Sequence, residues 1–409
     1  MAANELDVVD DEIVDAFDSA PSREITDEEY KKATGEYLHE TVDLSSWKRG
    51  IEALQDHQKL ESEIAAGEAA SADLRAEVRR TIFPIIPTLT GAPPCAGVYK
   101  CKTADVEQVQ RDLLMRGKVE GCDANVHVIN SLALQVIQIA VVGASYNGEE
   151  EAWAHRIFKR DIKVEPGANM VEIALDLLTR RSPDDTTKPK PKVVSDMMRR
   201  GVMTLMERQV LADALRAPWR IGHGNPLAYE LLTGSGSAKL ISLSLPVLRR
   251  IIEHKKFIYV PSDTTELDIK TIGDALEPFE YAIIKDTRAY LKRISEGHFR
   301  GEWALTMQRE LRGFIDDVAE QVVIGAYRAS RFAPAQVFYA HRDHAHEAAC
   351  IAIADSCMLD HRGFPMLIEM ADNFCRTYFS SQTLERPAYA AFAAADAPYR
   401  HLEERATRR

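Results

Sequence analysis

Three acidic residues far apart in the sequence each lie on or beside an apolar surface. Asp123 stands at the start of Lys118–Gly143, a long run rich in β-branched residues. Glu207 and Asp372 each interrupt an apolar stripe on a predicted helix. The apolar neighbours at helical spacing are Met203, Val210, Leu211 and Ala214 for Glu207, and Ile368, Cys375 and Phe379 for Asp372. Carboxylates in such places must be neutralised by a cation or by hydrogen bonds, so all three are candidate metal ligands.

Each of these acids also has a purely structural interpretation. Asp123 could form a turn within Cys122–Asn125. Glu207 could pair with one of the basic residues of its own helix, which are Arg200, Arg208 and Arg216. The sequence leaves these alternatives open.

The elements that must position the acids follow from the apolar pattern. Lys118–Gly143 contains too many apolar residues for one half-exposed strand, so it predicts two paired central strands joined at Asn130-Ser131. Ser195 is predicted to cap a strong helix over Asp196–Arg216, and Trp219–Leu227 is predicted to be a short strand that ends in a Gly/Pro turn. Three further elements are expected between these: sheet or sheet edge over Trp153–Lys163, a short helix over Met170–Thr179 and a polar loop over Arg181–Lys192.

The order of these features resembles the NurA-type nucleases. In that family a strand begins with an Asp-Gly-Ser-like motif, a helix carries a Glu, and a further strand ends in Asp-Gly-Pro-Leu. The corresponding segments of this sequence are Cys122-Asp123-Ala124-Asn125, Met206-Glu207-Arg208 and His223-Gly224-Asn225-Pro226-Leu227. His223 therefore stands where the family has an Asp, and Asn225 is inserted before the proline.

The resemblance continues downstream and spans roughly residues 90–380. Leu248–Tyr259 is predicted to be a basic helix followed by a strand. The segment Tyr281–Arg288 resembles the strand that delivers a lysine, here Lys285. Arg362-Gly363-Phe364-Pro365, followed by Asp372, resembles the last helix of the family, which bears a His or an Asp.

The resemblance implies an RNase H-like α/β domain with a mixed central sheet flanked by helices. It implies a Mn²⁺-dependent, or Mg²⁺-dependent, DNA nuclease that resects ends, works as a homodimer and docks on a HerA-type hexameric ATPase. Asp123, Glu207, His223 and Asp372 would then be the metal ligands, and Lys285 would hold the scissile phosphate. Two hard cations held by such oxygen ligands can activate water and stabilise the leaving oxygen of a phosphodiester.

Composition and charge indicate the cellular compartment and the organisation of the chain. The chain of 409 residues has a net charge of −12, of which residues 1–30 contribute −10, from eleven acids against Arg23. The six cysteines form no CxxC pair, no run of about 18 apolar residues is present and the N-terminus is acidic. These features predict a cytoplasmic chain without a membrane segment. We expect an acidic tail over residues 1–24, a helical arm over 25–82, a NurA-like domain over 83–400 and a tail over 401–409.

Two other segments contain residues that could do chemistry. His344 and His346 have metal-like spacing and are followed by Cys350 and Cys357, but the set fits no zinc template, and a polar helix start is the simpler interpretation. Thr233–Lys239 lacks the Gly-Lys-Ser/Thr ending of a phosphate loop. No other stretch supplies one, so any ATP-driven step must come from a partner.

Three hypotheses follow from these observations. The chain is an active metal-dependent DNA nuclease, or a NurA-like subunit whose metal site is impaired and which docks on the ATPase and guides DNA, or an unrelated α/β binding protein. Convergence of Asp123, Glu207 and Asp372 would separate the third hypothesis from the other two. Metal-dependent cleavage would separate the first from the second. Neither the polarity of digestion nor a role in repair or in antiphage defence follows from the sequence.

Overall fold

The computed structural model describes residues 24–48, 57–130, 135–148, 150–159, 197–262, 266–297 and 304–396. The chain divides into two compact units, residues 1–71 and 72–409, so the boundary falls inside a helix. The predicted tails over 1–24 and 401–409 lie almost entirely outside the described residues, of which only Glu24 belongs to them. The predicted helix over Met170–Thr179 and the polar loop that follows it lie outside them as well. No helix among the described residues is long and apolar enough to cross a membrane.

The described part of residues 24–71 is helical, as the sequence predicts. Its elements are α1 (Asp27–Thr34), α2 (Leu38–Thr41), the 3-10 turn η2 (Leu44–Ser46) and the first part of α3 (His57–Thr81). Helix α1 begins with a capping box, in which the Thr26 side chain accepts a hydrogen bond from the Glu29 backbone N–H and the Glu29 carboxylate accepts one from the Thr26 N–H. It ends at Gly35, which adopts the left-handed conformation.

The second unit is built on a nine-stranded mixed sheet with the order β1-β7-β8-β9-β6-β5-β2-β3-β4, which confirms the predicted mixed sheet flanked by helices. The strands are β1 (Gly97–Lys100), β2 (Val119–Asn130), β3 (Gln135–Ala144), β4 (Glu150–Lys159), β5 (Trp219–His223), β6 (Phe257–Val260), β7 (Glu280–Asp286), β8 (Val322–Tyr327) and β9 (Gln336–His341). Strand β5 pairs in parallel with both β2 and β6, and the other pairs are antiparallel.

The long apolar run forms two paired strands, β2 and β3, as predicted. They are not central, however, because only β4 lies beyond β3, and β4 forms the sheet edge expected near Trp153. The sequence pattern shows that β2 and β3 are largely buried, but burial by helices on both faces produces the same pattern in a strand near the edge.

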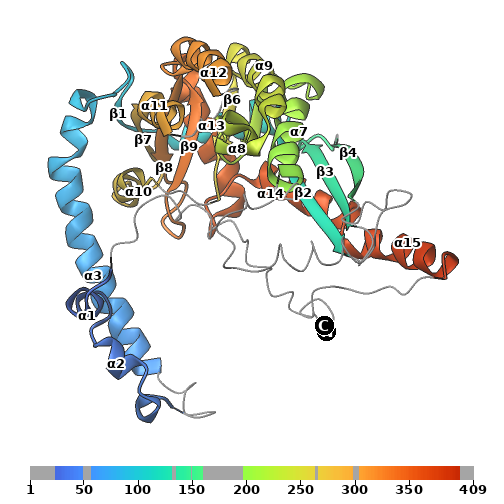
Figure 1. Ribbon diagram of the computed structural model, residues 1–409. Coiled ribbons are helices and arrows are strands. Elements are labelled where there is room, and N and C mark those ends of the chain that lie inside the picture. The colour runs from blue at the N-terminus through green and yellow to red at the C-terminus, as the bar shows by residue number, and fades with distance from the viewer. Residues whose placement is uncertain are drawn as a thin grey trace. The chain divides into compact units, whose positions relative to one another are not determined.

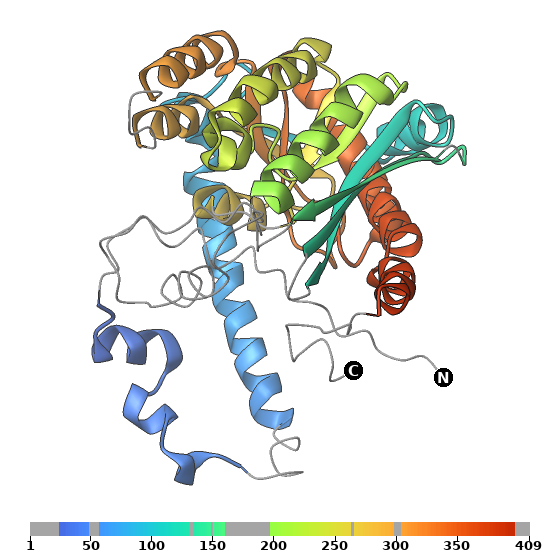
Figure 2. The ribbon, with the colours of Figure 1, turned by 45° about the vertical axis from the view of Figure 1, so that its right-hand side comes forward.

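Helices cover both faces of the sheet (Figures 1 and 2). One buried cluster joins Cys122 of β2 to Leu205 and Leu211 of the helical segment over Met197–Ala214. Another joins Val119 and Ile221 to the start of α14 (Met366–Tyr378). The helices of the second unit are α4 (Thr103–Val109), α7 (Met203–Gln209), α8 (Tyr229–Thr233), α9 (Ala238–His254), α10 (Leu267–Asp274), α11 (Arg288–Gly297), α12 (Ala304–Val318), α13 (Ala345–Ser356), α14 and α15 (Ser381–Ala394).

Two structural features determine where the candidate site residues lie. A Cβ atom added to Gly121 would lie 2.6 Å from the Leu367 Cβ and 2.7 Å from the Leu367 carbonyl oxygen, so only glycine lets α14 lie this close to β2. The helix predicted over Asp196–Arg216 is present from Met197 to Ala214, but α7 is flanked by the π-helical segments η6 (Met197–Val202) and η7 (Val210–Ala214). Such π-turns are frequent at functional sites.

Candidate active site

Asp123 lies in β2, one residue beyond the point where β2 pairs with β5. Its neighbour Cys122 is in register with Gly222 of β5, and Asp123 itself is opposite Val142 of β3. The residue is buried, with 6% of its surface exposed. Its Oδ1 accepts a hydrogen bond from the Ala124 backbone N–H at 2.8 Å. Asp123 lies within β2, so it does not form the turn that the sequence left open.

His223 is the last residue of β5 and contacts Asp123 directly. The His223 Nδ1 lies 3.3 Å from the Asp123 Oδ1, and the imidazole packs edge-on against Phe364 at 5.9 Å between ring centroids. Gly224 follows in the left-handed conformation with φ +81°, which turns the chain sharply as the strand ends. The contact with Asp123 brings together two residues that are one hundred positions apart in the sequence.

Glu207 approaches from α7 and is held by a buried ion pair. The Arg208 Nη1 donates to the Glu207 Oε1 at 2.5 Å, and both side chains are almost fully buried. Burial raises the pKa of Glu207, the Arg208 charge opposes that shift, and the Asp123 charge adds to it. The pairing with Arg208 is one of the structural alternatives that the sequence left open.

Arg208 also fixes the loop that follows β5. Its Nη2 donates to the backbone carbonyls of His223 at 3.0 Å and Asn225 at 2.8 Å, and its guanidinium lies 4.5 Å from the centroid of the Tyr259 ring. The guanidinium of Arg208 therefore positions both Glu207 and the residues around His223. From the sequence, Arg208 could be identified only as a candidate ion-pair partner of Glu207, because these carbonyl contacts depend on how β5 and α7 pack.

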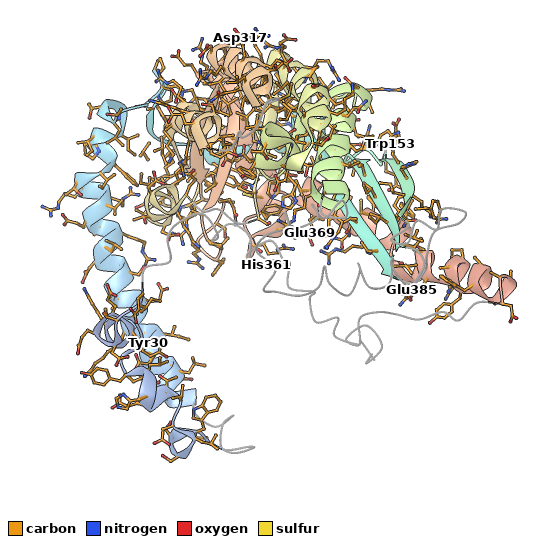
Figure 3. The ribbon with its side chains drawn as sticks, in the orientation of Figure 1. Tyr30, Trp153, Asp317, His361, Glu369 and Glu385 are labelled. Carbon is orange, nitrogen blue, oxygen red and sulfur yellow. The ribbon has the colours of Figure 1, made fainter. Side chains whose placement is uncertain are left out.

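Asp372 approaches Asp123 from α14. Burial raises the pKa of Asp372, the charge of Asp123 raises it further, and Arg376 one turn later lowers it. The Arg376 Nε donates to the Asp372 Oδ2 at 2.8 Å, which is a pair at the i, i+4 spacing that could have been found in the sequence. Glu369, labelled in Figure 3, lies one turn earlier on the same helix and binds Arg362 at 2.6 Å.

His127 is a neighbour that the sequence reasoning missed. It lies four residues after Asp123 on β2, and therefore on the same face of the strand. Burial, with a smaller contribution from the Arg376 charge, lowers its pKa, and its Nε2 is buried without a hydrogen-bond partner. The period of two along β2 was the signal that could have linked it to Asp123.

Of the predicted residues, His223 contacts Asp123, and the helices that carry Glu207 and Asp372 both pack against β2. Helices α7 and α14 lie on opposite faces of the β2–β3 pair (Figures 1 and 2), and the charges of both Glu207 and Asp372 interact with Asp123. Three carboxylates and an imidazole have the donor chemistry that a hard divalent cation such as Mn²⁺ requires. Within the part of the chain that the structure describes, however, no three such side chains are grouped closely enough to hold a metal ion as they stand.

Lys285 is not brought to this cluster. It lies on β7, and β8, β9, β6 and β5 separate that strand from β2, a distance of roughly 24 Å across five strand spacings. Its Nζ is bound by Glu266 at 2.6 Å and by Asp268 at 2.9 Å. A phosphate bound at Asp123 is out of reach of this amine.

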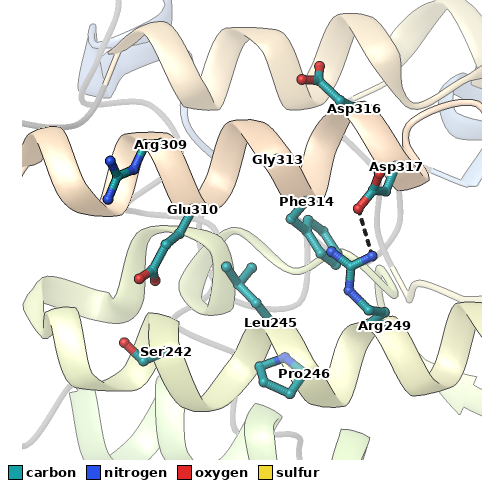
Figure 4. Close-up of a pocket in the computed structure, with 10 residues that line it drawn as sticks. All are labelled: Ser242, Leu245, Pro246, Arg249, Arg309, Glu310, Gly313, Phe314, Asp316 and Asp317. Carbon is teal, nitrogen blue, oxygen red and sulfur yellow. Dashed lines mark hydrogen bonds and ion pairs between the residues drawn. The ribbon is translucent and has the colours of Figure 1, made fainter.

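The other segments singled out from the sequence are separate from the site. His344 lies in the turn before α13 and binds Glu347, and the His346 Nδ1 lies 3.0 Å from the Tyr281 hydroxyl, so the polar helix start is what the structure has. A groove of about 830 Å³ lies between α9 and α12, and its lining includes Leu245 and Phe314 (Figure 4). An ion pair of 2.8 Å joins Arg249 and Asp317 beside it.

Comparison with known proteins gives similarity at the level of structure. No known protein-family profile and no curated protein matches the sequence. The NurA nuclease from Sulfolobus solfataricus covers 71% of this chain and 93% of its own, with a TM-score of 0.39 and 8% identity. A NurA structure with dAMP and manganese covers 80% and 95%, with a TM-score of 0.39 and 8% identity. Endonuclease V from Ciona intestinalis, in complex with DNA containing inosine, covers 67% and 95%, with a TM-score of 0.26 and 14% identity. The chain itself has a mixed α/β fold.

Proposed function

We propose that the chain is a metal-dependent nuclease that hydrolyses phosphodiester bonds of DNA at the cluster around Asp123. The observation that carries this proposal is the contact of His223 with the buried Asp123, on a strand against which the helices of Glu207 and Asp372 pack. Asp123 contacts His223 at 3.3 Å, and the carboxylates of Glu207 and Asp372 act on it electrostatically from two sides. Buried acids of like charge on separate elements are costly, and function is the usual reason for such an arrangement.

The donor types of this cluster are those that a divalent cation takes, although the described side chains would have to move together to hold one. Asp123, His223 and Asp372 would hold it, together with Glu207 once that carboxylate turns from Arg208. When bound, the cation would lower the pKa of a water molecule and balance the charge on the phosphate. The chain itself contributes Asp123, which orients the imidazole of His223, and Arg208, which holds the following loop through the carbonyls of His223 and Asn225.

A second candidate function is that of a NurA-like subunit that docks on an ATPase and guides DNA without cutting it. The observation that favours it is the buried Arg208, whose guanidinium already neutralises Glu207 at 2.5 Å. His223 also supplies no negative charge where a fourth acid would stand. A cation at this position then competes with an internal positive charge, which weakens metal binding.

We further propose DNA, a HerA-like hexameric ATPase and a second copy of this chain as partners in the cytoplasm. The sequence supports an external ATPase because it contains no phosphate loop. The six cysteines are all free thiols, which supports a reducing compartment. The resemblance to NurA-type motifs supports the choice of ATPase and the homodimer.

Cleavage of end-labelled linear DNA tests the proposed activity. The full-length chain should cut DNA with Mn²⁺, cut it more slowly with Mg²⁺ and be inactive in EDTA. Asp123→Asn should abolish cutting, whereas Asp274→Asn, an exposed acid on α10, should leave it unchanged. Inactivity of the wild type in both metals, with and without the ATPase, would favour the docking subunit. If Asp123→Asn cut DNA as fast as the wild type, the assignment of the site to Asp123 would be wrong.

A further inference from the structure

Two cysteines that are far apart in the sequence lie against each other in the second unit. Cys101 follows β1, and its backbone N–H donates to the Phe279 carbonyl oxygen at 2.9 Å. Cys350 lies on α13, and its Sγ is 2.6 Å from the Sγ of Cys101. Both are free thiols. Because an S–S bond is about 2.05 Å long, a small movement of the two side chains is enough to join them.

The two thiols differ in how readily they ionise. A hydrogen bond from the Cys101 thiol lowers the pKa of the Cys350 thiol, because it stabilises the thiolate. The same hydrogen bond, together with burial, raises the pKa of Cys101, and burial raises the pKa of the four remaining cysteines. The thiolate is the reactive form of cysteine, so Cys350 is the thiol of this chain that an oxidant should meet first.

Cys350 can be reached through a pocket, whereas Cys101 is buried with 4% of its surface exposed. The pocket has a volume of about 430 Å³, with apolar and acidic walls that include Val109, Leu113, Trp219, Asp105, Asp112 and Glu347. His346 also lines it, but burial lowers the pKa of this imidazole, so at neutral pH it adds no positive charge. Such a pocket favours an uncharged, apolar molecule and repels an anion.

We propose that Cys350 and Cys101 form a redox-sensitive pair that an uncharged organic hydroperoxide oxidises to a disulfide through this pocket. The Cys350 sulfur attacks the terminal peroxide oxygen, the O–O bond breaks, and an alcohol leaves with the proton of the Cys350 thiol. The Cys101 sulfur then attacks the resulting sulfenic acid, and the S–O bond breaks as the S–S bond forms, which releases water with the Cys101 proton. The two thiols lose two electrons, and the hydroperoxide gains them. The disulfide would tie α13 to the chain after β1, and this inference does not rest on the proposed nuclease activity.

Peptide mapping of the oxidised full-length chain tests the pair. Reduced wild type treated with cumene hydroperoxide should give a peptide that links Cys101 to Cys350, lighter by two hydrogen atoms than the separate peptides, and dithiothreitol should reverse the link. In Cys101→Ser, dimedone should trap Cys350 as a sulfenic acid, whereas Cys350→Ser should lose thiols at least several-fold more slowly than the wild type. Cys95→Ser is the matched control, since the Cys95 Sγ lies 4.0 Å from the Arg342 carbonyl oxygen, and it should behave as the wild type does. Absence of the linked peptide from the wild type, or unchanged oxidation of Cys350→Ser, would overturn the proposal.

Glutathione disulfide, which carries a net negative charge, tests the choice of oxidant. Its rate of reaction with Cys350 is divided by its rate with a small neutral thiol, N-acetylcysteine amide, and the same ratio is measured for cumene hydroperoxide. The ratio for glutathione disulfide should be at least several-fold lower, because the acids of the pocket repel it. Alkylation of the remaining Cys350 thiol at successive times, followed by mass spectrometry, gives both rates. Equal ratios would show that the pocket does not select an uncharged oxidant and would overturn this assignment.

Discussion

At the residue scale, metal binding depends on the number of negative charges around Asp123 that no basic residue neutralises, and this number is small. Glu207 is neutralised by Arg208 and Asp372 by Arg376, whereas the nearest partner of Asp123 is an imidazole. An imidazole binds one ion through one nitrogen, so a second cation is held more weakly than it would be with a fourth acid in place of His223. Mn²⁺ tolerates nitrogen ligands better than Mg²⁺ does, and this difference determines the expected metal preference.

We expect His223→Asp to raise Mg²⁺-supported cleavage about tenfold, equivalent to about 1.4 kcal/mol of activation free energy. The added carboxylate supplies the missing charge and can bridge two ions. His223→Ala should leave cleavage unchanged or lower it. Initial rates for the three proteins across a titration of each metal are the measurement. A His223→Asp variant that is slower than wild type in Mg²⁺ would contradict the assigned role.

The two ion pairs beside Asp123 should differ in their effect on stability. Glu207→Gln leaves the buried Arg208 uncompensated and should lower the free energy of unfolding by about 3 kcal/mol. Asp372→Asn frees an Arg376 whose side chain is 64% exposed, so it should cost about 1 kcal/mol or less. Urea unfolding of both variants at pH 7 measures the difference. Equal costs would show that Arg208 finds another partner or water.

Single-residue patterns predicted part of this site. Asp123, Glu207 and Asp372 could be identified because each breaks an apolar pattern, and the helices that carry Glu207 and Asp372 pack against the strand that carries Asp123. The role of Arg208 in the loop could not be identified, since it depends on carbonyls that reach it through tertiary packing. Lys285 was assigned to the site from a motif, but its distance from Asp123 depends on strand order, which local sequence does not encode.

At the element scale, α14 is positioned by a close approach and by a buried acid. Gly121 lets the helix lie against β2. Asp355 of α13, fully buried, accepts hydrogen bonds from the Tyr146 hydroxyl at 2.5 Å and from the Leu367 backbone N–H at 3.1 Å. The second bond fixes the first turn of α14, and Asp372 follows on the same helix. Asp355 thus supports the site from a distance.

Stability should fall with rising pH because of Asp355. Burial raises its pKa from 3.8 to about 6, so the folded chain keeps a proton that the unfolded chain releases near pH 4. Between about pH 4 and 6 the free energy of unfolding should therefore decrease, by up to about 3 kcal/mol, and then level off. Asp355→Asn should abolish this decrease in the free energy of unfolding between about pH 4 and 6. Denaturation at several pH values compares the two proteins, and parallel curves would rule the explanation out.

Elements were predicted where local patterns decide them. The paired strands β2 and β3 follow from the density of β-branched residues. The π-helical segments on both sides of α7 could not be predicted, because their extra residue per turn is fixed by packing and not by composition. The position of β2 and β3 near the sheet edge could not be predicted either. A buried strand near the edge has the same apolar sequence pattern as a central strand.

At the scale of the whole molecule, the account requires a partner for ATP-driven movement. We expect the full-length chain to shift to a larger mass when a HerA-like hexamer is added, because the chain has no phosphate loop of its own. Size-exclusion chromatography with light scattering detects the complex. A protein that neither forms dimers nor shifts with the ATPase would argue against the assembly, although cleavage could still occur without it.

Binding of Mn²⁺ tests the central claim most directly, because the claim is that the side chains around Asp123 together hold a divalent cation. Titration of the full-length chain, followed by the electron paramagnetic resonance signal of free Mn²⁺, measures the number of bound ions and their affinity. The account predicts saturable binding that weakens at least about tenfold in Asp123→Asn and is unchanged in Asp274→Asn. Equal binding by wild type and Asp123→Asn, or no saturable binding by wild type, would contradict it.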